Sequence, residues 1–89
     1  MENTRKRSVS LLQMKQVCER LSISRSSLYN RIKDGLITPP INIGTTAVRW
    51  PDSEIDTLVA AMITGKTKAE LQRLVNDLTI QRNNSTPQH

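Results

Sequence analysis

The sequence predicts a mainly α fold: a two-helix helix-turn-helix, a short β-hairpin, a third helix and an additional C-terminal helix. Three observations lead to this prediction. Two short amphipathic segments meet at a tight turn within residues 14–35, alternating apolar residues flank a turn within 41–50, and two later stretches have helical periodicity. Because a hairpin directly after a helix-turn-helix is a wing, the predicted architecture is a winged helix-turn-helix.

The first helix of the pair is indicated by Val17, Cys18 and Leu21, which lie at i, i+1 and i+4 and therefore on one side of a helix. No Ser, Thr, Asp or Asn lies within residues 11–16, so the start of this helix is weakly marked. We expect that stretch to lead the chain into the core. Cys18, the single cysteine, is expected to be a small core residue rather than a sensor thiol.

The second helix is expected to begin at Arg25, because the Ser24 hydroxyl can accept from free backbone N–H groups of the next turn. Leu28 and Ile32 are four residues apart and point inward. Gly35, which follows Asp34, is free to adopt the left-handed conformation that ends a helix.

A polar stripe is predicted on the opposite face of this second helix, formed by Ser26, Asn30 and Lys33 with Tyr29 at its edge. Short, hydrogen-bonding and basic side chains suit the major groove of DNA, where base edges present distinct donor and acceptor patterns. An ordinary helical hairpin with a solvated face has the same periodicity. The small Cys18, the short turn and the charge distribution favour DNA binding.

A hairpin is predicted after two prolines at 39 and 40, which exclude a helix there. Apolar residues alternate on both sides of a turn at 44–47, at Ile41, Ile43, Val48 and Trp50. Trp50 is expected to anchor the core rather than to stack on a base. The wing residues able to contact phosphate are Thr45, Thr46 and Arg49.

The third helix is expected to begin with Pro51 and to place acidic residues near its positive end, at Asp52, Glu54 and Asp56. Its inner face has apolar residues at helical spacing, namely Ile55, Leu58, Val59 and Met62. Gly65 ends this helix.

A C-terminal helix begins at a capping box from Thr67 to Glu70 and ends near Arg82. It carries a narrow apolar seam of Leu71, Leu74, Val75 and Leu78. Two interpretations of the seam are open. The helix folds back to complete the core, or the seam pairs with another copy of the chain in a homodimer or DNA-templated oligomer.

The sequence predicts four segments. We expect residues 1–10 to form a flexible basic arm, 11–65 the winged helix-turn-helix domain, 66–82 the C-terminal helix and 83–89 a disordered tail. In the arm, Arg5, Lys6 and Arg7 either reach a phosphate backbone or minor groove, or belong to a solubilising tail.

Positive charge is concentrated in the first third of the chain. Residues 1–33 hold eight Lys or Arg against two Glu, whereas the remaining 56 hold five against six acidic residues, and the whole chain of 89 residues has a formal net charge of +5. A polyanionic partner such as double-stranded DNA fits this distribution.

Other classes of protein are disfavoured by composition. One cysteine and one terminal histidine, His89, provide no structural zinc site or catalytic set, and we expect no cofactor, no metal and no enzyme activity. No apolar run approaches the roughly 20 residues of a membrane span, so we expect no membrane contact and a cytoplasmic, nucleoid-associated protein.

Residues from Leu12 to about Gly65 resemble the AlpA-type phage regulators and the related small excisionases, which share a MerR-like winged helix-turn-helix domain. The matching stretches are VCERLSISRSSLYNRIKDG, PPINIG, AVRW and SEID. The resemblance implies a role in a prophage or integrative element, either in controlling an integrase promoter or in directing excision. It also implies DNA binding through the wing around Gly44 and through the second helix, at Ser24, Arg25, Ser26, Ser27, Tyr29 and Asn30.

Three departures from the family pattern stand out. Arg31 replaces a commonly apolar residue and is free to turn outward toward a phosphate. The tip at residues 44–46 lacks the basic residue often found there, and the segment after Gly65 is longer than the usual ending. These departures bear on the strength of wing contacts and on oligomeric state.

The mechanism we expect assigns base reading to Asn30, which can pair with adenine, and to Arg25, which can pair with guanine. Ser26 and Ser27 would hold a phosphate at the helix N-terminus. The DNA backbone would be anchored by Arg20, Arg31, Lys33 and Arg49. The alternative from another class is a protein-interaction module that binds an integrase or RNA polymerase.

Overall fold

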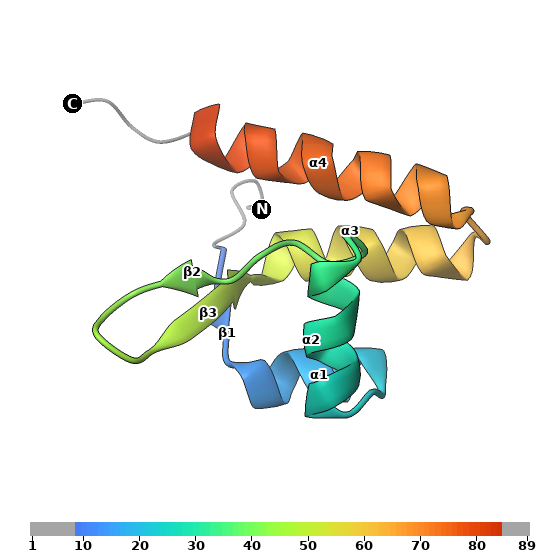
Figure 1. The fold of residues 1–89 in the computed structure, drawn as a ribbon. Coiled ribbons are helices and arrows are strands. Elements are labelled where there is room, and N and C mark those ends of the chain that lie inside the picture. The colour runs from blue at the N-terminus through green and yellow to red at the C-terminus, as the bar shows by residue number, and fades with distance from the viewer. Residues whose placement is uncertain (1–8, 85–89) are drawn as a thin grey trace, which may run out of the picture.

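The computed structural model describes residues 9–84. Its elements are β1 (Leu11–Leu12), α1 (Met14–Leu21), α2 (Arg25–Lys33), β2 (Ile41–Asn42), β3 (Val48–Pro51), α3 (Asp52–Ile63) and α4 (Lys68–Asn84). Figure 1 shows α1 and α2 joined by a tight turn, the β2–β3 hairpin projecting to the left and α4 running alongside α3. The predicted mainly α, winged helix-turn-helix architecture with an added C-terminal helix is confirmed.

The turn between α1 and α2 is held by a cap on each side. Ser22 has a left-handed φ of 55°, and the N–H groups of residues 22 and 23 donate to carbonyls in the last turn of α1 at 3.2 and 3.0 Å. Ser24 then accepts from the backbone N–H of Ser27 at 3.1 Å, which confirms the predicted N-cap. The two caps together fix where α2 begins relative to α1.

Helix α2 ends as predicted, at a left-handed glycine. Gly35 has φ 76°, its N–H donates to the carbonyl of Ile32 at 3.1 Å, and the N–H of Leu36 donates to that of Arg31 at 2.8 Å. This pair of bonds is a Schellman motif, which satisfies carbonyls that the helix itself leaves open.

Helix α4 begins at the predicted capping box. The N–H of Thr67 donates to Glu70 Oε1 at 2.8 Å, and the N–H of Glu70 donates to Thr67 Oγ1 at 3.1 Å. The hydrogen bond from the Thr67 backbone lowers the pKa of the Glu70 carboxyl below its ordinary value. At its other end the helix continues to Asn84, beyond the expected end near Arg82.

The N-terminal end of the domain differs from expectation. Residues 11 and 12 form a third strand, so that the sheet order is β1-β3-β2 with Leu12 opposite Trp50. Ser10, which the sequence analysis placed in the flexible arm, makes two hydrogen bonds with Asp52: its carbonyl accepts from the Asp52 N–H at 2.8 Å, and its N–H donates to Asp52 Oδ1 at 3.2 Å. Pro51 is the last residue of β3 and the N-cap of α3, with ψ 131°, instead of the first helical residue.

The start of α1 is also capped in a way that the sequence signals did not reveal. The Gln16 side chain reaches back and its Oε1 accepts from the backbone N–H of Gln13 at 2.8 Å. Glutamine at this third helical position completes half of a capping box without the usual Ser or Thr.

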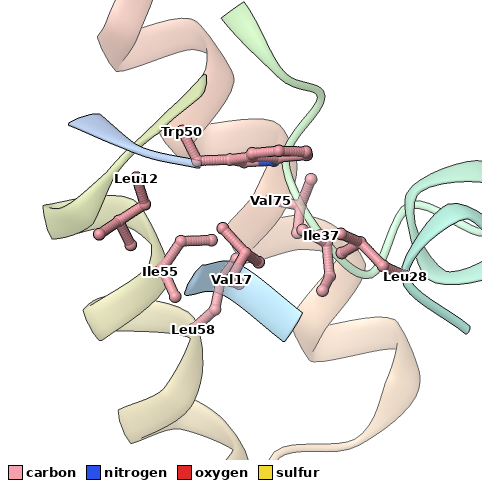
Figure 2. Packing of buried hydrophobic residues seen from close by; sticks show 8 residues of the cluster. All are labelled: Leu12, Val17, Leu28, Ile37, Trp50, Ile55, Leu58 and Val75. Carbon is pink, nitrogen blue, oxygen red and sulfur yellow. The ribbon is translucent and has the colours of Figure 1, made fainter. Parts of the chain in front are cut away.

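The core lies where the sheet, α1, α2, α3 and α4 meet. Figure 2 shows its eight buried side chains, Leu12, Val17, Leu28, Ile37, Trp50, Ile55, Leu58 and Val75. Trp50 is completely buried and its indole Nε1 donates to the carbonyl of Thr38 at 2.8 Å, which confirms its expected role as a core anchor. The Thr38 side chain is also buried, but its hydroxyl has no hydrogen-bond partner among the described residues.

Of the two interpretations of α4, the structure has the helix folded back. Val75 is buried in the core, and Leu74 and Leu78 pack against it, while Leu71 is half-buried. Three of the four seam residues therefore contact the chain's own core. Arg82, near the end of α4, is held by Glu54 of α3.

The left-handed position at Ser22 gives a stability prediction. Replacing Ser22 with Gly should raise the free energy of unfolding by about 0.5–1 kcal/mol, because glycine adopts this conformation without the Cβ penalty. Gly35→Ala should lower the free energy of unfolding by a similar amount. A Cβ there meets only ordinary van der Waals contact, so the loss comes from the positive φ, which alanine adopts at a cost. Urea unfolding measures both; a loss of stability in Ser22→Gly would contradict the cap assignment.

A second stability prediction concerns Thr38. Thr38→Val replaces an unpartnered buried hydroxyl with a methyl group of similar shape, and should stabilise the fold by about 1 kcal/mol. Thr79→Val is the matched control, because the Thr79 hydroxyl donates to the Val75 carbonyl at 2.8 Å and its removal should give no gain. Thermal and urea unfolding should therefore show a gain in stability for Thr38→Val and none for Thr79→Val.

Candidate nucleic-acid interface

The outward face of α2 carries the predicted polar stripe. Ser26, Asn30 and Lys33 are exposed, and Tyr29 beside them is 53% exposed. Leu28, on the opposite side of the helix, is fully buried. The inner face of α2 is thus fixed by the core, and its hydrogen-bonding side chains project together into solvent along one surface.

The N-terminal turn of α2 has unused donors. Ser24 Oγ accepts from Ser27, and the Ser24 carbonyl accepts from the N–H of Leu28 at 3.0 Å. Within residues 9–84, no hydrogen bond engages the N–H of Arg25 or Ser26. Two free N–H groups at the positive end of a helix dipole form a surface suited to an anionic oxygen.

Helix α2 carries three basic side chains. Arg25 and Lys33 are exposed, and Arg31, which the family pattern led us to expect turned outward, is half-buried. None of the three has a hydrogen-bonding or ion-pair partner among the described residues. Their charges are consequently uncompensated at short range.

The other two expected backbone contacts are already engaged within the protein. Arg20 forms an ion pair with Asp56 of α3, with side chains 42% and 50% exposed. Arg49 is half-buried, and its Nη1 donates to the Val48 carbonyl at 2.8 Å. Part of each guanidinium's hydrogen-bonding capacity is therefore already used within the protein.

The wing is a two-stranded hairpin in which Ile41 lies opposite Arg49 and Asn42 opposite Val48. The N–H of Ile43 donates to the Ala47 carbonyl at 3.0 Å and closes the tip. Gly44, Thr45 and Thr46 are exposed there, as is Ile43 at 48% exposure. The tip thus presents two hydroxyls and no positive charge.

The remaining predicted contacts, Arg5, Lys6 and Arg7, lie outside the described residues. Across residues 9–84, no cluster of three or more His, Cys, Asp or Glu side chains could hold a metal ion. No helix within that same range is long and apolar enough to cross a membrane. Cys18 is half-buried and packs against the core, as expected.

Sequence reasoning missed three polar residues that organise this surface from behind. Gln72 and Arg82 of α4 bond to the ends of segments that flank α2 and the wing, and Glu54 is the buried partner of Arg82. Glu54 and Arg82 are 28 residues apart, so no local pattern connects them. The one hint in the sequence was that Glu54 is an acidic residue on the otherwise apolar inner face of α3, which indicates a basic partner from another element.

A helix-turn-helix with an outward polar stripe and an adjacent wing is typical of small DNA-binding regulators. The chain belongs to the family of the Prophage CP4-57 regulatory protein (AlpA), whose model matches residues 10–63, more than half of its length. Searches of curated proteins and of solved structures found no match. The family is one of phage regulatory proteins, and its match ends with α3, before α4 begins.

The wing tip provides a test of the interface. A Cβ at Gly44 meets nothing within 4 Å and its φ is not in the left-handed region, so Gly44→Lys should be accommodated without strain. The added charge should tighten binding to duplex DNA and steepen the slope of log affinity against log salt by about 0.9.

Ile63→Lys is the matched control for this variant, because Ile63 is 79% exposed at the end of α3 and the same charge is added away from α2 and the wing. Fluorescence anisotropy at several salt concentrations measures both. Equal slopes for the two lysine variants would place the wing tip away from the DNA.

Proposed function

We propose that this protein is a sequence-specific double-stranded DNA-binding regulator of a prophage or integrative element, acting in the cytoplasm at the nucleoid to control integrase or other prophage genes. The observation that carries the proposal is the exposed stripe of Ser26, Tyr29, Asn30 and Lys33 on α2, beside two free N–H groups. Family membership supports the regulatory role.

In this proposal α2 enters the major groove and Asn30 and Arg25 read bases. Asn30 is exposed near the middle of the helix and can pair bidentately with adenine, whereas Arg25 lies at the first helical position and can pair with guanine. Each such pair contributes roughly 1–3 kcal/mol of discrimination against a wrong base. Tyr29 would cover the edge of the same contact surface.

Phosphate contacts would flank these base contacts. Ser26 combines an exposed hydroxyl with a free N–H, whereas the N–H of Ser27 is already bonded to Ser24, so Ser26 is the better phosphate ligand. Lys33 and Arg31 would anchor the backbone through charge. On the wing, which we infer to be MerR-like, Thr45 and Thr46 would add hydrogen bonds.

One domain of this size makes few base contacts, so useful specificity requires more than one copy on adjacent sites or a partner protein such as an integrase or RNA polymerase. A regulator would bind repeats near a promoter. An excision factor, the alternative role, would bind repeats beside an attachment site and bend the DNA. The location of the binding sites therefore distinguishes these two roles.

The experiment is selection of host genomic fragments with purified protein at near-physiological salt, followed by mapping of the enriched repeats. Enrichment beside promoters of integrase or prophage genes is expected. Enrichment beside an attachment site would instead assign the excision role. Absence of enrichment, together with weak and salt-independent binding, would indicate a protein-interaction module.

The division between base and backbone contacts is tested by Asn30→Ala and Lys33→Ala. Asn30→Ala should weaken binding to a selected fragment by roughly 1–3 kcal/mol while binding to random duplex changes little. Lys33→Ala should weaken both DNAs to a similar extent and reduce the salt slope by about 0.9. If Asn30→Ala weakened binding to both DNAs equally, Asn30 would not be a base-reading residue.

A further inference from the structure

Helix α4 contacts the recognition helix and the base of the wing, although it lies beyond the residues that the family model matches. In Figure 1 it lies along α3 with its two ends on opposite sides of the domain. Two polar side chains, Gln72 in its first half and Arg82 near its end, make the contacts. Each joins α4 to the end of a different segment.

Gln72 holds the C-terminal end of α2. Its Nε2 donates to the carbonyl of Asp34, the C-cap residue of the recognition helix, at 2.8 Å. Its Cγ lies 3.7 Å from the position that a Cβ would take at Gly35, so the two segments are in close contact. The carbonyls at a helix end have no partner within the helix, and α4 supplies one here.

Arg82 holds the segment that leads into the wing. Its Nε and Nη2 donate to the two carboxylate oxygens of Glu54 at 2.9 and 2.6 Å, and Nη2 also donates to the carbonyl of Pro39 at 2.9 Å. The Arg82 and Glu54 side chains are only 18% and 8% exposed. Pro39 lies two residues before β2, so this guanidinium connects α4, α3 and the base of the hairpin.

A rigid spacer therefore links the two contacts. Gln72 and Arg82 lie ten residues apart on one uninterrupted helix, which is about 15 Å along its axis. Between them, Val75 is buried and Leu78 packs on the core, which prevents the helix from sliding. A bidentate arginine–carboxylate pair adds a fixed geometry that a single point charge does not.

From these contacts we propose that α4 positions the DNA interface: Gln72 and Arg82 are positioning residues that fix the recognition helix and the wing relative to each other. The inference rests on the proposed function, because α2 and the wing must meet one duplex at the same time. Loosening either contact lets one element move while the other is bound. Binding to a specific site should then weaken although every DNA-contacting side chain is intact.

The test uses the full chain with Gln72→Ala and Arg82→Lys. Gln72→Ala removes an exposed side chain, and Arg82→Lys keeps the charge beside buried Glu54 while losing the fork that also reaches Pro39. The matched controls are Gln81→Ala and Arg73→Lys, exposed positions on the same helix whose side chains make no hydrogen bond within residues 9–84. Urea unfolding establishes that every variant is folded at the assay temperature.

The first measurement needs no DNA. Residual dipolar couplings of backbone amides report the orientation of α2 relative to the β2–β3 hairpin. We expect Gln72→Ala and Arg82→Lys to change this orientation or to average it by motion, and the two controls to leave it as in the parent chain. Unchanged couplings in both variants would overturn the inference.

The second measurement is affinity for a genomic fragment selected by the parent chain and for a random duplex of the same length. Loss of one hydrogen bond predicts a roughly twofold to tenfold weaker affinity for the selected fragment, with a smaller change on random DNA. Affinities equal to those of the controls would also overturn it. If the parent chain bound no duplex, the proposed function would fail, and the dipolar couplings would still decide whether α4 positions α2 and the wing.

Discussion

The buried indole of Trp50, hydrogen-bonded to the Thr38 carbonyl, is the contact on which the rest of the domain depends. Trp50 lies on the central strand β3, which pairs with β1 on one side and β2 on the other and continues directly into α3. Thr38 belongs to the segment between α2 and the wing. This one side chain thus joins the segment after α2 to the sheet and to α3. Because the core is small, a large aromatic group at its centre leaves the surrounding elements little freedom to move.

The exposed surface of α2 follows from this core. Leu28 inserts into the cluster with Ile37 and Val75, so the helix can present only its other face to solvent, and that face carries hydrogen-bonding and basic side chains. Caps at both ends of α2 hold its backbone: Ser24 at the start, and the left-handed Gly35 at the end. Two arginines, Arg20 and Arg49, have partners inside the protein, whereas Arg25 and Arg31 have none among the described residues. The positive charges are therefore not all equally available to a polyanion.

Local rules were sufficient for the elements with a local cause. The apolar spacing of α2, the Ser24 cap, the glycine after α2 and the Thr67 capping box each depend on residues within a few positions, and each was found where predicted. Contacts between distant residues left no such pattern. Strand β1 exists because Leu12 pairs with Trp50, and the Glu54–Arg82 bridge joins residues on separate helices. For the same reason two interpretations of the α4 seam were open from the sequence, since an apolar stripe has the same spacing whether its own core or another chain covers it. The residues assigned to DNA contact remain predictions of chemistry that the geometry accommodates.

The central claim is that α2 and the wing form one DNA-binding surface, and an NMR titration of isotopically labelled protein with a selected genomic fragment tests it most directly. We expect the largest amide shift changes on residues 25–33 and 44–49, with Asn30 and Arg25 side-chain signals among them, and we expect these changes to weaken in a common way as salt is raised. Shift changes confined to the end of α3, around the exposed Ile63, would contradict this claim, because Ile63 lies outside both α2 and the wing.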